Sequence, residues 1–444
     1  MKKSFLLVAA VCSALSVAAE GYQVNTFSTR QEGMGHVGVA MKLGAESNIF
    51  NPAGVAFSDK TLDFSGAVSA IKSSATATSA GKDYTTSNKI STPFNISAAF
   101  RIYDNLYAGV SMFTPYGSSI DWGESWAGAA LNQSVDLKIF TVQPTVSWRI
   151  LPNLSVGAGL MISWGTVNLN KGLVNPQSLD MLMGAMGLPV RFGEVTPASV
   201  NLKGTSELAL GFNVGAMYDI TRQITVGASF RSKMNMKVTK GDAMVSYANE
   251  QAQQILGQTL DNLNSTNFAA SMPAPYVFTF GVAYKPIEKL VVAFDAQLNG
   301  WKTYDFLDFS FENLEAFNQH LTKNYRNSWT YHLGAQYALT NRFDVRAGIM
   351  IDQTPCDKDY YNPETPGMTR IEPSAGLSFR PIPSLSIDVA FMYVHGAGAK
   401  GATGQYEDFI AKSYPQLQLP VTGEFTADYK LHAIIPAVGL RYAF

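Results

Sequence analysis

Charged residues are scarce in this sequence and almost balanced in sign. They make up 15% of 444 residues, with 33 Lys and Arg against 34 Asp and Glu and a formal net charge of −1. A chain with this balance has no basic surface for nucleic acid. Metal-ligand spacing is missing as well, because the five histidines are scattered: His36, His320, His332, His395 and His432. The sequence also lacks the Gly-x-Ser-x-Gly run of a lipase. We therefore expect no nucleic-acid partner, no metal, no cofactor and no enzymatic activity.

Long apolar runs and cysteines are also lacking. No run of eighteen apolar residues follows the N-terminus, which excludes a helical membrane protein. Residues 1–19 have the pattern of a secretory signal peptide, with Lys2 and Lys3 before an apolar core and small residues at 17–19. Its removal takes away Cys12 and leaves Cys356 without a disulfide partner. We place Cys356 in an extracellular loop and assign it no chemistry.

The sequence is rich in glycine and aromatic residues, with 37 Gly, 20 Tyr and 26 Phe. From Thr61 to Phe444, apolar and polar residues alternate with period 2, the pattern of β-strands with two different faces. We count fourteen such segments: 61–74, 90–103, 106–116, 135–150, 154–171, 200–219, 223–240, 274–286, 288–303, 328–339, 343–354, 370–381, 384–397 and 430–444.

The connections between these segments alternate strictly between short and long. Six are tight turns, such as Leu151-Pro152-Asn153 and Leu339-Thr340-Asn341-Arg342. Seven are long: 75–89, 117–134, 172–199, 241–273, 304–327, 355–369 and 398–429. Outer-membrane barrels have short periplasmic turns and long outer loops, and bacterial ones have an even number of strands.

The two faces of the segments differ in chemistry. In the tenth segment, Trp329, Tyr331 and Leu333 alternate with Thr330 and His332. Burying both faces would leave polar groups unsatisfied, whereas lipid outside and a lumen inside suits both faces. The sequence therefore predicts an all-β fold, a fourteen-stranded antiparallel transmembrane β-barrel in a Gram-negative bacterial outer membrane, which we expect to be monomeric.

Residues 20–60 do not follow the strand pattern. This Gly-rich stretch offers at most a short helix between Ala40 and Phe50, followed by Asn51-Pro52-Ala53-Gly54. Proline fixes its own φ and restricts the residue before it, so a helix stops there. We predict an N-terminal hatch over 20–60 that plugs a barrel formed by 61–444. An ordinary turn at residues 51–54 is the alternative.

At this point the chain resembles the FadL/TodX family of outer-membrane transporters for fatty acids and other hydrophobic molecules. The resemblance covers the whole mature chain. It rests on the hatch motif Asn51-Pro52-Ala53, on the run from Phe113 to Gly117 (Phe-Thr-Pro-Tyr-Gly) and on the strand count with its aromatic C-terminus. It also rests on two motifs after the third segment, Asp121-Trp122 and Trp126-Ala127-Gly128. Ala129 departs from the arginine that often follows that glycine.

The resemblance implies a passive mechanism. Cargo is captured among the outer loops, binds inside the barrel and leaves sideways into outer-membrane lipid through an opening at a kink in the third strand, gated by the hatch. Phe113, Pro115 and Gly117 are the expected kink residues, because proline cannot donate to the ladder and glycine weakens it. The aromatic residue at position 444 resembles the signal read by the outer-membrane insertion machinery.

Two long loops contain apolar residues at helical spacing. In the first, a helix capped at Ser178 would carry Leu179, Leu182, Met183 and Met186. In the second, Ile255, Leu256 and Leu260 repeat at the spacing of one helix face. These residues either form a hydrophobic capture groove, for which Met is well suited, or simply pack on one another above the barrel.

A fatty-acid carboxylate would need a cation in a largely apolar pocket. Strand parity turns ten charged residues toward the lumen: Arg101, Arg149, Glu207, Arg231, Lys233, Asp295, Arg346, Glu372, Asp388 and Arg441. Most are expected to pair with one another. Arg231 and Lys233, below the apolar loops, are the candidates for binding a carboxylate.

Two other functions remain open. The long loops also suit a surface receptor or adhesin, for example one that binds haem. A general porin is disfavoured, because a plug blocks free diffusion.

Overall fold

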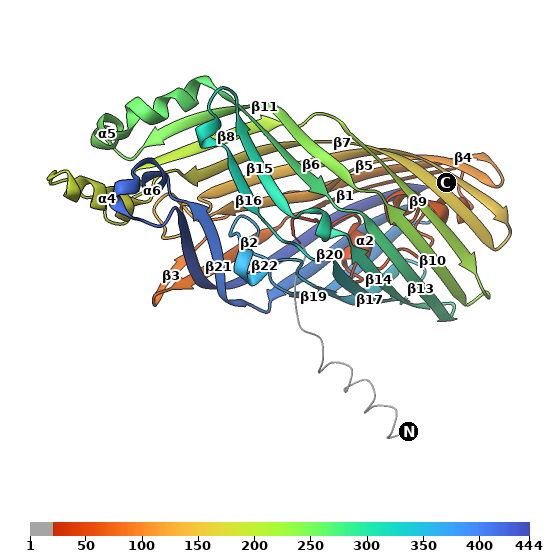
Figure 1. Cartoon of the computed structure of the whole chain (residues 1–444). Coiled ribbons are helices and arrows are strands. Elements are labelled where there is room, and N and C mark those ends of the chain that lie inside the picture. Colours follow the sequence, from red (N-terminus) through yellow and green to blue (C-terminus); the bar gives the residue numbers. More distant parts are fainter. Residues whose placement is uncertain (1–20) are drawn as a thin grey trace.

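The computed structural model describes residues 21–444, so the predicted signal peptide and Cys12 lie outside the described residues. Fourteen strands form a closed antiparallel ring, drawn as a long barrel in Figure 1. The ring closes where the last strand pairs with the first, with Val68 opposite Val438. In ring order the strands are β1 (Leu62–Ser69), β4 (Phe94–Tyr103), β5 (Leu106–Asp121), β6 (Ser134–Leu151), β7 (Leu154–Gly172), β9 (Ala209–Asp219), β10 (Ile224–Arg231), β13 (Val277–Ile287), β14 (Leu290–Asn299), β17 (Ser328–Ala338), β18 (Phe343–Asp352), β19 (Arg370–Ile382), β20 (Leu385–Gly396) and β22 (Thr422–Ala443).

Eight further strands lie in the long connections. They extend the wall beyond the ring on the side away from the tight turns, for example where β2 pairs with the outer part of β22. These strands are β2 (Lys72–Ser79), β3 (Lys82–Thr85), β8 (Ala198–Thr205), β11 (Met234–Tyr247), β12 (Asn267–Ala274), β15 (Phe306–Phe311), β16 (Gln319–Thr322) and β21 (Ala399–Glu407). The sequence analysis did not count these as separate strands.

Two predicted segments each form two strands. Segment 200–219 divides into β8 and β9, and segment 223–240 divides into β10 and β11. The inner members β9 and β10 pair in the ring, with Gly215 opposite Ser229. The outer members β8 and β11 pair with each other above it, with Lys203 opposite Asp242. Apolar and polar residues alternate in the same way whichever strands pair. The sequence pattern therefore does not reveal that β8 and β11 pair with each other above the ring.

The short helices α4 (Pro176–Ala185), α5 (Glu250–Leu260) and α6 (Phe409–Ser413) cover the outer end of the molecule, at the left in Figure 1. The long connections also contain the 3-10 turns η3 (Asp261–Ser265), η4 (Trp301–Thr303), η5 (Glu315–Phe317), η6 (Lys358–Tyr360) and η7 (Pro415–Leu417). The cap of α4 is Asn175, whose side chain accepts from the Gln177 and Ser178 amides, so the predicted cap at Ser178 was wrong. No helix among residues 21–444 is both long enough and apolar enough to span a membrane.

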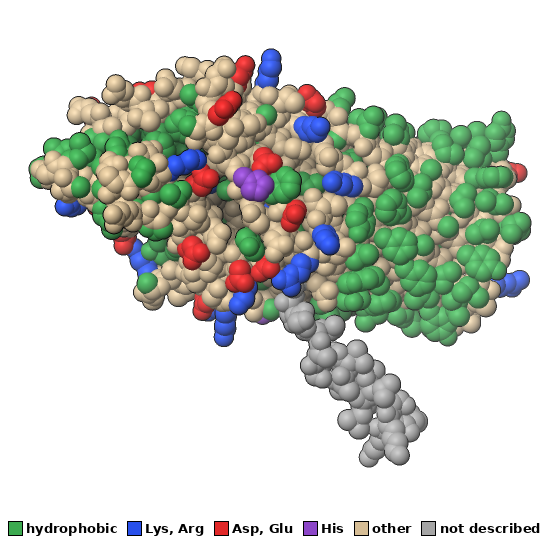
Figure 2. Space-filling model, viewed as in Figure 1, with side chains coloured by type: hydrophobic (Ala, Val, Ile, Leu, Met, Phe, Trp, Pro, Cys, Tyr) green, Lys and Arg blue, Asp and Glu red, His purple; other side chains and the backbone are tan. Residues whose placement is uncertain are grey.

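The two faces of the ring differ as the alternation predicts. On β17, Leu333 is 48% exposed, whereas Thr330 is fully buried and His332 is 3% exposed. Apolar side chains cover the half of the barrel that carries the tight turns, and charged groups gather on the other half (Figure 2). This belt of exposed apolar side chains matches the lipid-facing band of a transmembrane barrel.

The hatch lies inside the ring as a compact series of short helices: α2 (Thr29–Glu32), η1 (Gly44–Glu46), α3 (Ser47–Phe50) and η2 (Pro52–Phe57). Buried polar contacts join it to the wall. Asp295 of β14 accepts from the amides of Gly38 (2.7 Å) and Val39 (3.0 Å), and the His332 ring bonds the carbonyl of Gly35. These contacts satisfy backbone groups of a loop-rich segment that would otherwise be unpaired inside the barrel.

Candidate functional site

The third strand of the ring, β5, contains an irregularity beside a break in the wall. Its register against β6 passes from Phe113 opposite Thr141 to Tyr116 opposite Ile139, so β5 carries one extra residue there. Such bulges bend a strand and disrupt the ladder. On the other side, β4 pairs with β5 only as far as Phe113. The predicted kink residues Phe113, Pro115 and Gly117 therefore lie where β5 loses its β4 partner.

The N-terminal segment, residues 21–28, occupies the edge that β4 leaves free. The Val24 amide donates to the Pro115 carbonyl (2.9 Å), and the Gly117 amide donates to the Tyr22 carbonyl (2.8 Å). Gln23 and Tyr116 stand opposite each other in an isolated antiparallel bridge. Two backbone hydrogen bonds therefore hold the start of the described chain against the bulge.

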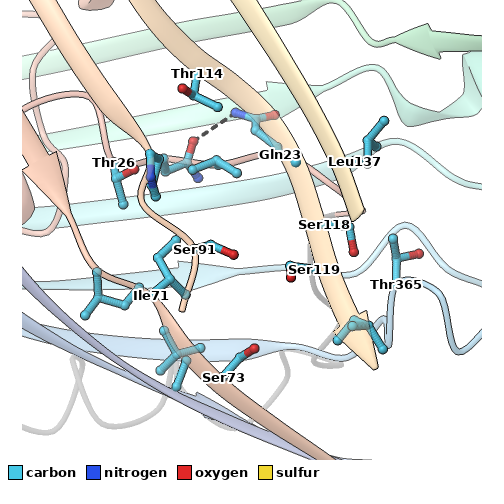
Figure 3. Close-up of a pocket in the computed structure, with 18 of the residues that line it drawn as sticks. Gln23, Thr26, Ile71, Ser73, Ser91, Thr114, Ser118, Ser119, Leu137 and Thr365 are labelled. Atoms are coloured by element: carbon cyan, nitrogen blue, oxygen red, sulfur yellow. Dashed lines mark hydrogen bonds between the residues drawn. The ribbon is translucent and has the colours of Figure 1, made fainter. Parts of the chain in front are cut away.

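A cavity of about 420 Å³, which we call the gap cavity, lies at this break. Its lining side chains come from the N-terminal segment (Gln23, Thr26), from β5 (Thr114, Ser118, Ser119) and from the opposite side (Ile71, Ser73, Ser91), as Figure 3 shows. Within it, Gln23 Nε2 donates to Asn25 Oδ1 at 3.0 Å, the dashed line in that figure. Hydroxyl and amide groups dominate the labelled lining, so amphipathic molecules can meet hydrogen-bonding partners here.

A second, smaller cavity of about 90 Å³, the apolar cavity, lies inside the barrel. Its lining is mostly aliphatic, aromatic and methionine side chains, including Val135, Leu137, Ile139, Val167, Leu169, Leu202, Met236, Val238, Phe268, Met272, Leu307 and Phe309. It shares Ser118, Leu137 and Thr365 with the gap cavity. The two spaces are thus immediate neighbours.

Tyr22 of the N-terminal segment lines the apolar cavity, while its neighbours Gly21 and Gln23 line the gap cavity. Its ring packs edge-on against Trp301 (centroids 4.8 Å apart), Tyr116 (5.8 Å) and Tyr304 (5.8 Å). Its hydroxyl donates to the carbonyl of Pro273. Tyr22 therefore stands between the two cavities, held by aromatic contacts and one buried hydrogen bond. Sequence analysis missed this residue.

Two buried lysines lie next to lining residues of the apolar cavity, although neither lysine lines it. Glu364, which lines the cavity, accepts from Lys323 Nζ at 2.5 Å, and the Lys323 side chain is only 1% exposed. Lys171, two residues beyond the lining residue Leu169, is buried and donates to Gln319 Oε1 at 3.0 Å. This region therefore holds two cations and one carboxylate, in surroundings where an unpaired charge is costly.

The carboxylate candidates predicted from sequence lie elsewhere. Arg231 is buried, donates to the Ile49 carbonyl of the hatch at 3.2 Å and lies over the rings of Phe27 and Phe113. Lys233 is exposed, so the expectation that it shares the lumenal face with Arg231 was wrong. The inward residues change from odd to even numbers between β10 and β11, where Met234 is buried.

Most of the other predicted lumenal charges are buried in the barrel or half-buried in ion pairs. Asp295, Arg346, Glu372 and Asp388 are buried, and Arg441 bonds Asp63 at 2.5 Å. Arg101 and Glu207 are exposed instead, at or beyond strand ends, and Arg149 is half-buried beside a tight turn. The odd or even position of a residue in a strand predicts which face its side chain is on. It does not predict the height of the residue along the barrel, and that height decides whether a charged side chain is buried.

The predicted hatch motif is held by both the hatch and the wall. Asn51 caps η2 by accepting from the Ala53 amide (3.1 Å), and it donates to the carbonyls of Val39 (2.7 Å) and Ala216 (3.0 Å). The Ala53 carbonyl accepts from Ser147 and Ser155. Pro52 packs on Gly157 of β7 so closely that a Cβ there would collide with it.

The apolar residues of the two outer loops form one cluster. Leu179, Leu182 and Met183 of α4 share it with Leu256 and Leu260 of α5, and Ile255 packs against it. Met186 is 61% exposed beyond the end of α4. The two predicted helices therefore contribute to one apolar cluster, and Met186 is available at the surface.

Cys356 lies in the connection between β18 and β19 as a half-buried free thiol. Burial raises the pKa of this thiol, which keeps it in the less reactive protonated form.

Comparisons with known proteins bear on the whole chain. The family model described as outer membrane protein transport protein (OMPP1/FadL/TodX) matches residues 10–444. The chain is 22% identical over 419 residues to the long-chain fatty acid transport protein of Escherichia coli O6:H1, covering 91% of this chain and 93% of that one.

Two solved structures share the fold. One is a Pseudomonas aeruginosa FadL homologue, with a TM-score of 0.77 and 17% identity over 96% of this chain and 100% of the other. Another is the Pseudomonas putida toluene transporter TodX, with a TM-score of 0.69 and 16% identity over 93% and 97% of the two chains.

Proposed function

Because the chain belongs to the OMPP1/FadL/TodX family of outer-membrane transport proteins, we propose that it takes up hydrophobic small molecules passively and releases them sideways between β4 and β5. It is an outer-membrane protein of a Gram-negative bacterium, as its family and its apolar belt indicate. Since named relatives are transporters, we assign it no catalytic activity.

One observation carries this proposal: the apolar cavity and the break in the wall are neighbours, separated by Tyr22 and the backbone beside it. A molecule in the apolar cavity reaches the gap cavity if the N-terminal segment leaves the edge of β5. One bridge of two backbone hydrogen bonds and the ring contact of Tyr22 with Tyr116 hold that segment on β5. The hatch thus acts as the gate, and the bulge around Phe113, Pro115 and Gly117 keeps β4 from closing the opening.

The cations next to the apolar cavity suit a cargo with an acidic head group. Lys171 and Lys323 together exceed the charge of Glu364 by one, and an incoming carboxylate would balance them. We assign first recognition of the head group to Lys171 and Lys323. Arg231, beside the bulge and the hatch, is a further proposed carboxylate contact on the way out. The exposed Lys233 is less suited.

We propose that capture begins at the outer helices, where Met186 is exposed above the apolar cluster. No further protein is needed in this scheme: the partners are the cargo, the surrounding lipid and, during biogenesis, the insertion machinery. A haem receptor or adhesin would use the outer loops without the wall opening, and a porin would require an open lumen, which the hatch obstructs.

Uptake of radiolabelled oleate tests this function in cells that lack their own fatty-acid transporter. Cells expressing this chain should accumulate oleate faster than cells with an empty vector. Equal accumulation, with single-channel conductance from the purified protein, would contradict the proposal and favour a porin.

A paired measurement tests the head-group assignment. Lys171→Met should slow uptake of oleate about tenfold, corresponding to the loss of one charge-assisted hydrogen bond, and leave uptake of uncharged methyl oleate unchanged. Lys203→Met, an exposed lysine on β8, is the matched control. Equal loss for both cargoes would show that Lys171 acts only structurally.

A further inference from the structure

A third cavity, of about 240 Å³, lies at the end of the barrel that carries the tight turns. The hatch side contributes Arg30 and Lys60, and the wall contributes Arg346, Arg380 and Arg441. Asp344 is its one acidic lining residue, so five cationic side chains face this space with a single carboxylate. We call it the arginine cavity. None of its lining residues lines the gap cavity or the apolar cavity.

Each arginine is held in place by a partner. Arg441 bonds Asp63 (2.5 Å), Arg30 bonds Glu46 (2.6 Å), and Arg380 forms a two-pronged pair with Asp344. Arg346 donates to Gln336 (2.8 Å) and Ser378 (2.6 Å). These contacts fix the guanidinium groups in position before any ligand arrives, which lowers the cost of binding one.

These ion pairs leave some guanidinium N–H groups available to a ligand in the cavity. A guanidinium has five N–H groups, and Glu46 and Asp63 do not line the space. The buried Arg30 Nε has no hydrogen-bond partner among residues 21–444. The side chains of Arg30, Arg380 and Arg441 are 13%, 28% and 25% exposed, so small solutes can reach them.

Arg346 also lies 3.7 Å from Asp344, so each arginine has an acidic partner, but Asp344 alone among these acids lines the space. The cations of the hatch and of the wall surround an open volume rather than a closed one. We propose that the arginine cavity binds a soluble phosphate-class oxyanion from the periplasmic side. Planar guanidinium groups match phosphate oxygens in a two-pronged geometry. At about 30 Å³ for each water displaced, the cavity holds a group the size of a diphosphate or a small phosphomonoester.

The bound anion would bridge the hatch and the wall, because Arg30 and Lys60 belong to the N-terminal sixty residues and the other three cations to ring strands. A ligand that binds only the docked state stabilises that state by mass action. The anion therefore holds the hatch in place. This inference is independent of the transported cargo, since binding is measured without one.

Isothermal titration of the purified full chain with pyrophosphate tests the site. In a neutral detergent at low ionic strength, we expect saturable binding with one site per chain, weakened about tenfold in Arg380→Gln and about threefold in Lys60→Gln. Lys60 is partly exposed and its ion pair, with the exposed Asp59, is long at 3.8 Å, so Lys60→Gln should keep the fold even if Arg380→Gln does not. Arg342→Gln, an exposed residue in the neighbouring turn that is absent from the lining, should bind as the unmodified protein does.

Two outcomes would overturn the proposal. One is the absence of saturable binding, or equal binding by Lys60→Gln, Arg380→Gln and the unmodified chain. The other comes from nanodiscs: if phosphatidylglycerol abolishes pyrophosphate binding while phosphatidylcholine does not, a lipid head group occupies the cavity rather than a soluble anion.

Discussion

Glycine is the residue that sets how closely the hatch approaches the wall. At Gly334 of β17 a Cβ would collide with the carbonyl oxygen of Met34, and at Gly215 of β9 with the side-chain oxygen of Asn51. At these two positions the ring strands meet the hatch with their backbone. This close approach lets wall groups such as Asp295 and His332 reach hatch backbone atoms.

Gly334→Ala should loosen the hatch without opening the ring. The added methyl group must displace the Met34 backbone, an overpacking that costs about 1–3 kcal/mol. Amides of residues 29–57 should therefore exchange hydrogen about fivefold faster or more, as measured by mass spectrometry. Gly66→Ala on β1 is the matched control, because its Cβ would lie 3.8 Å from the nearest atom outside its own segment. Equal exchange in the two variants would refute the close-approach argument.

Glu32 should make hatch docking dependent on pH. Its carboxyl group is fully buried in α2, accepts from Ser69 Oγ at 2.6 Å and has one oxygen, Oε1, without a partner among residues 21–444. Burial raises the pKa of Glu32 from 4.5 to about 8, with a further increase from nearby Glu372, against the lowering effect of the Ser69 hydrogen bond. The docked hatch therefore holds this group as the neutral acid at neutral pH.

The sign of the pH dependence follows from this shift. Between about pH 4.5 and pH 8 the exposed group of an undocked hatch loses its proton while the docked group keeps it, so docking weakens as pH rises. The protection factors of hatch amides, in which the intrinsic rise of the exchange rate with pH is divided out, should fall over this range and level off above it. Glu32→Gln should remove the pH dependence of docking that Glu32 causes. An unchanged pH profile in that variant would show that Glu32 is not the source of the pH dependence.

At the scale of elements, the two halves of β5 differ in the segments that pair with them. Up to Phe113 it is an ordinary ring strand between β4 and β6. Beyond the bulge the N-terminal segment takes the place of β4. The proposed gate therefore substitutes for a strand through two backbone hydrogen bonds, supported by the packing of Tyr22.

A disulfide between Gln23→Cys and Tyr116→Cys should lock this gate. The two residues face each other as a pair without mutual backbone hydrogen bonds, for which Cα atoms are about 4.5 Å apart, within the range for a disulfide. The oxidised variant should lose oleate uptake, and dithiothreitol should restore it. Each single variant serves as a control, and uptake by the oxidised protein equal to that of the reduced one would exclude movement of this segment.

At the scale of the whole molecule, the ring and the hatch are stabilised differently. Backbone hydrogen bonds close the ring on itself, from β1 around to β22. The hatch depends on the wall, since its short helices are too few to bury a core of their own. Loss of the hatch should therefore leave the ring folded.

Deleting residues 21–57 should leave a folded ring that conducts ions. The closed ladder of hydrogen bonds remains, and water can hydrate the polar lumenal groups that the hatch now covers. Planar bilayers should show steady conductance for the deletion variant and little for the unmodified chain. A variant that retains strand signal in circular dichroism yet fails to conduct would mean that the outer helices also block the lumen.

The sequence by itself determined the fold class, the alternation of faces and the order of tight turns and long connections, because each is written in residues close together along the chain. The kink residues that it predicts, Phe113, Pro115 and Gly117, lie at or beside the β5 bulge. The sequence did not determine how β8 and β11 leave the ring or why Lys233 turns outward.

Only the tertiary structure placed Tyr22, Lys171, Lys323 and Glu364 around one cavity. These residues are brought together by closure of the ring and by the inserted N-terminal segment. Such contacts depend on which strands pair and in what register, and period-2 alternation is the same for every choice of partner.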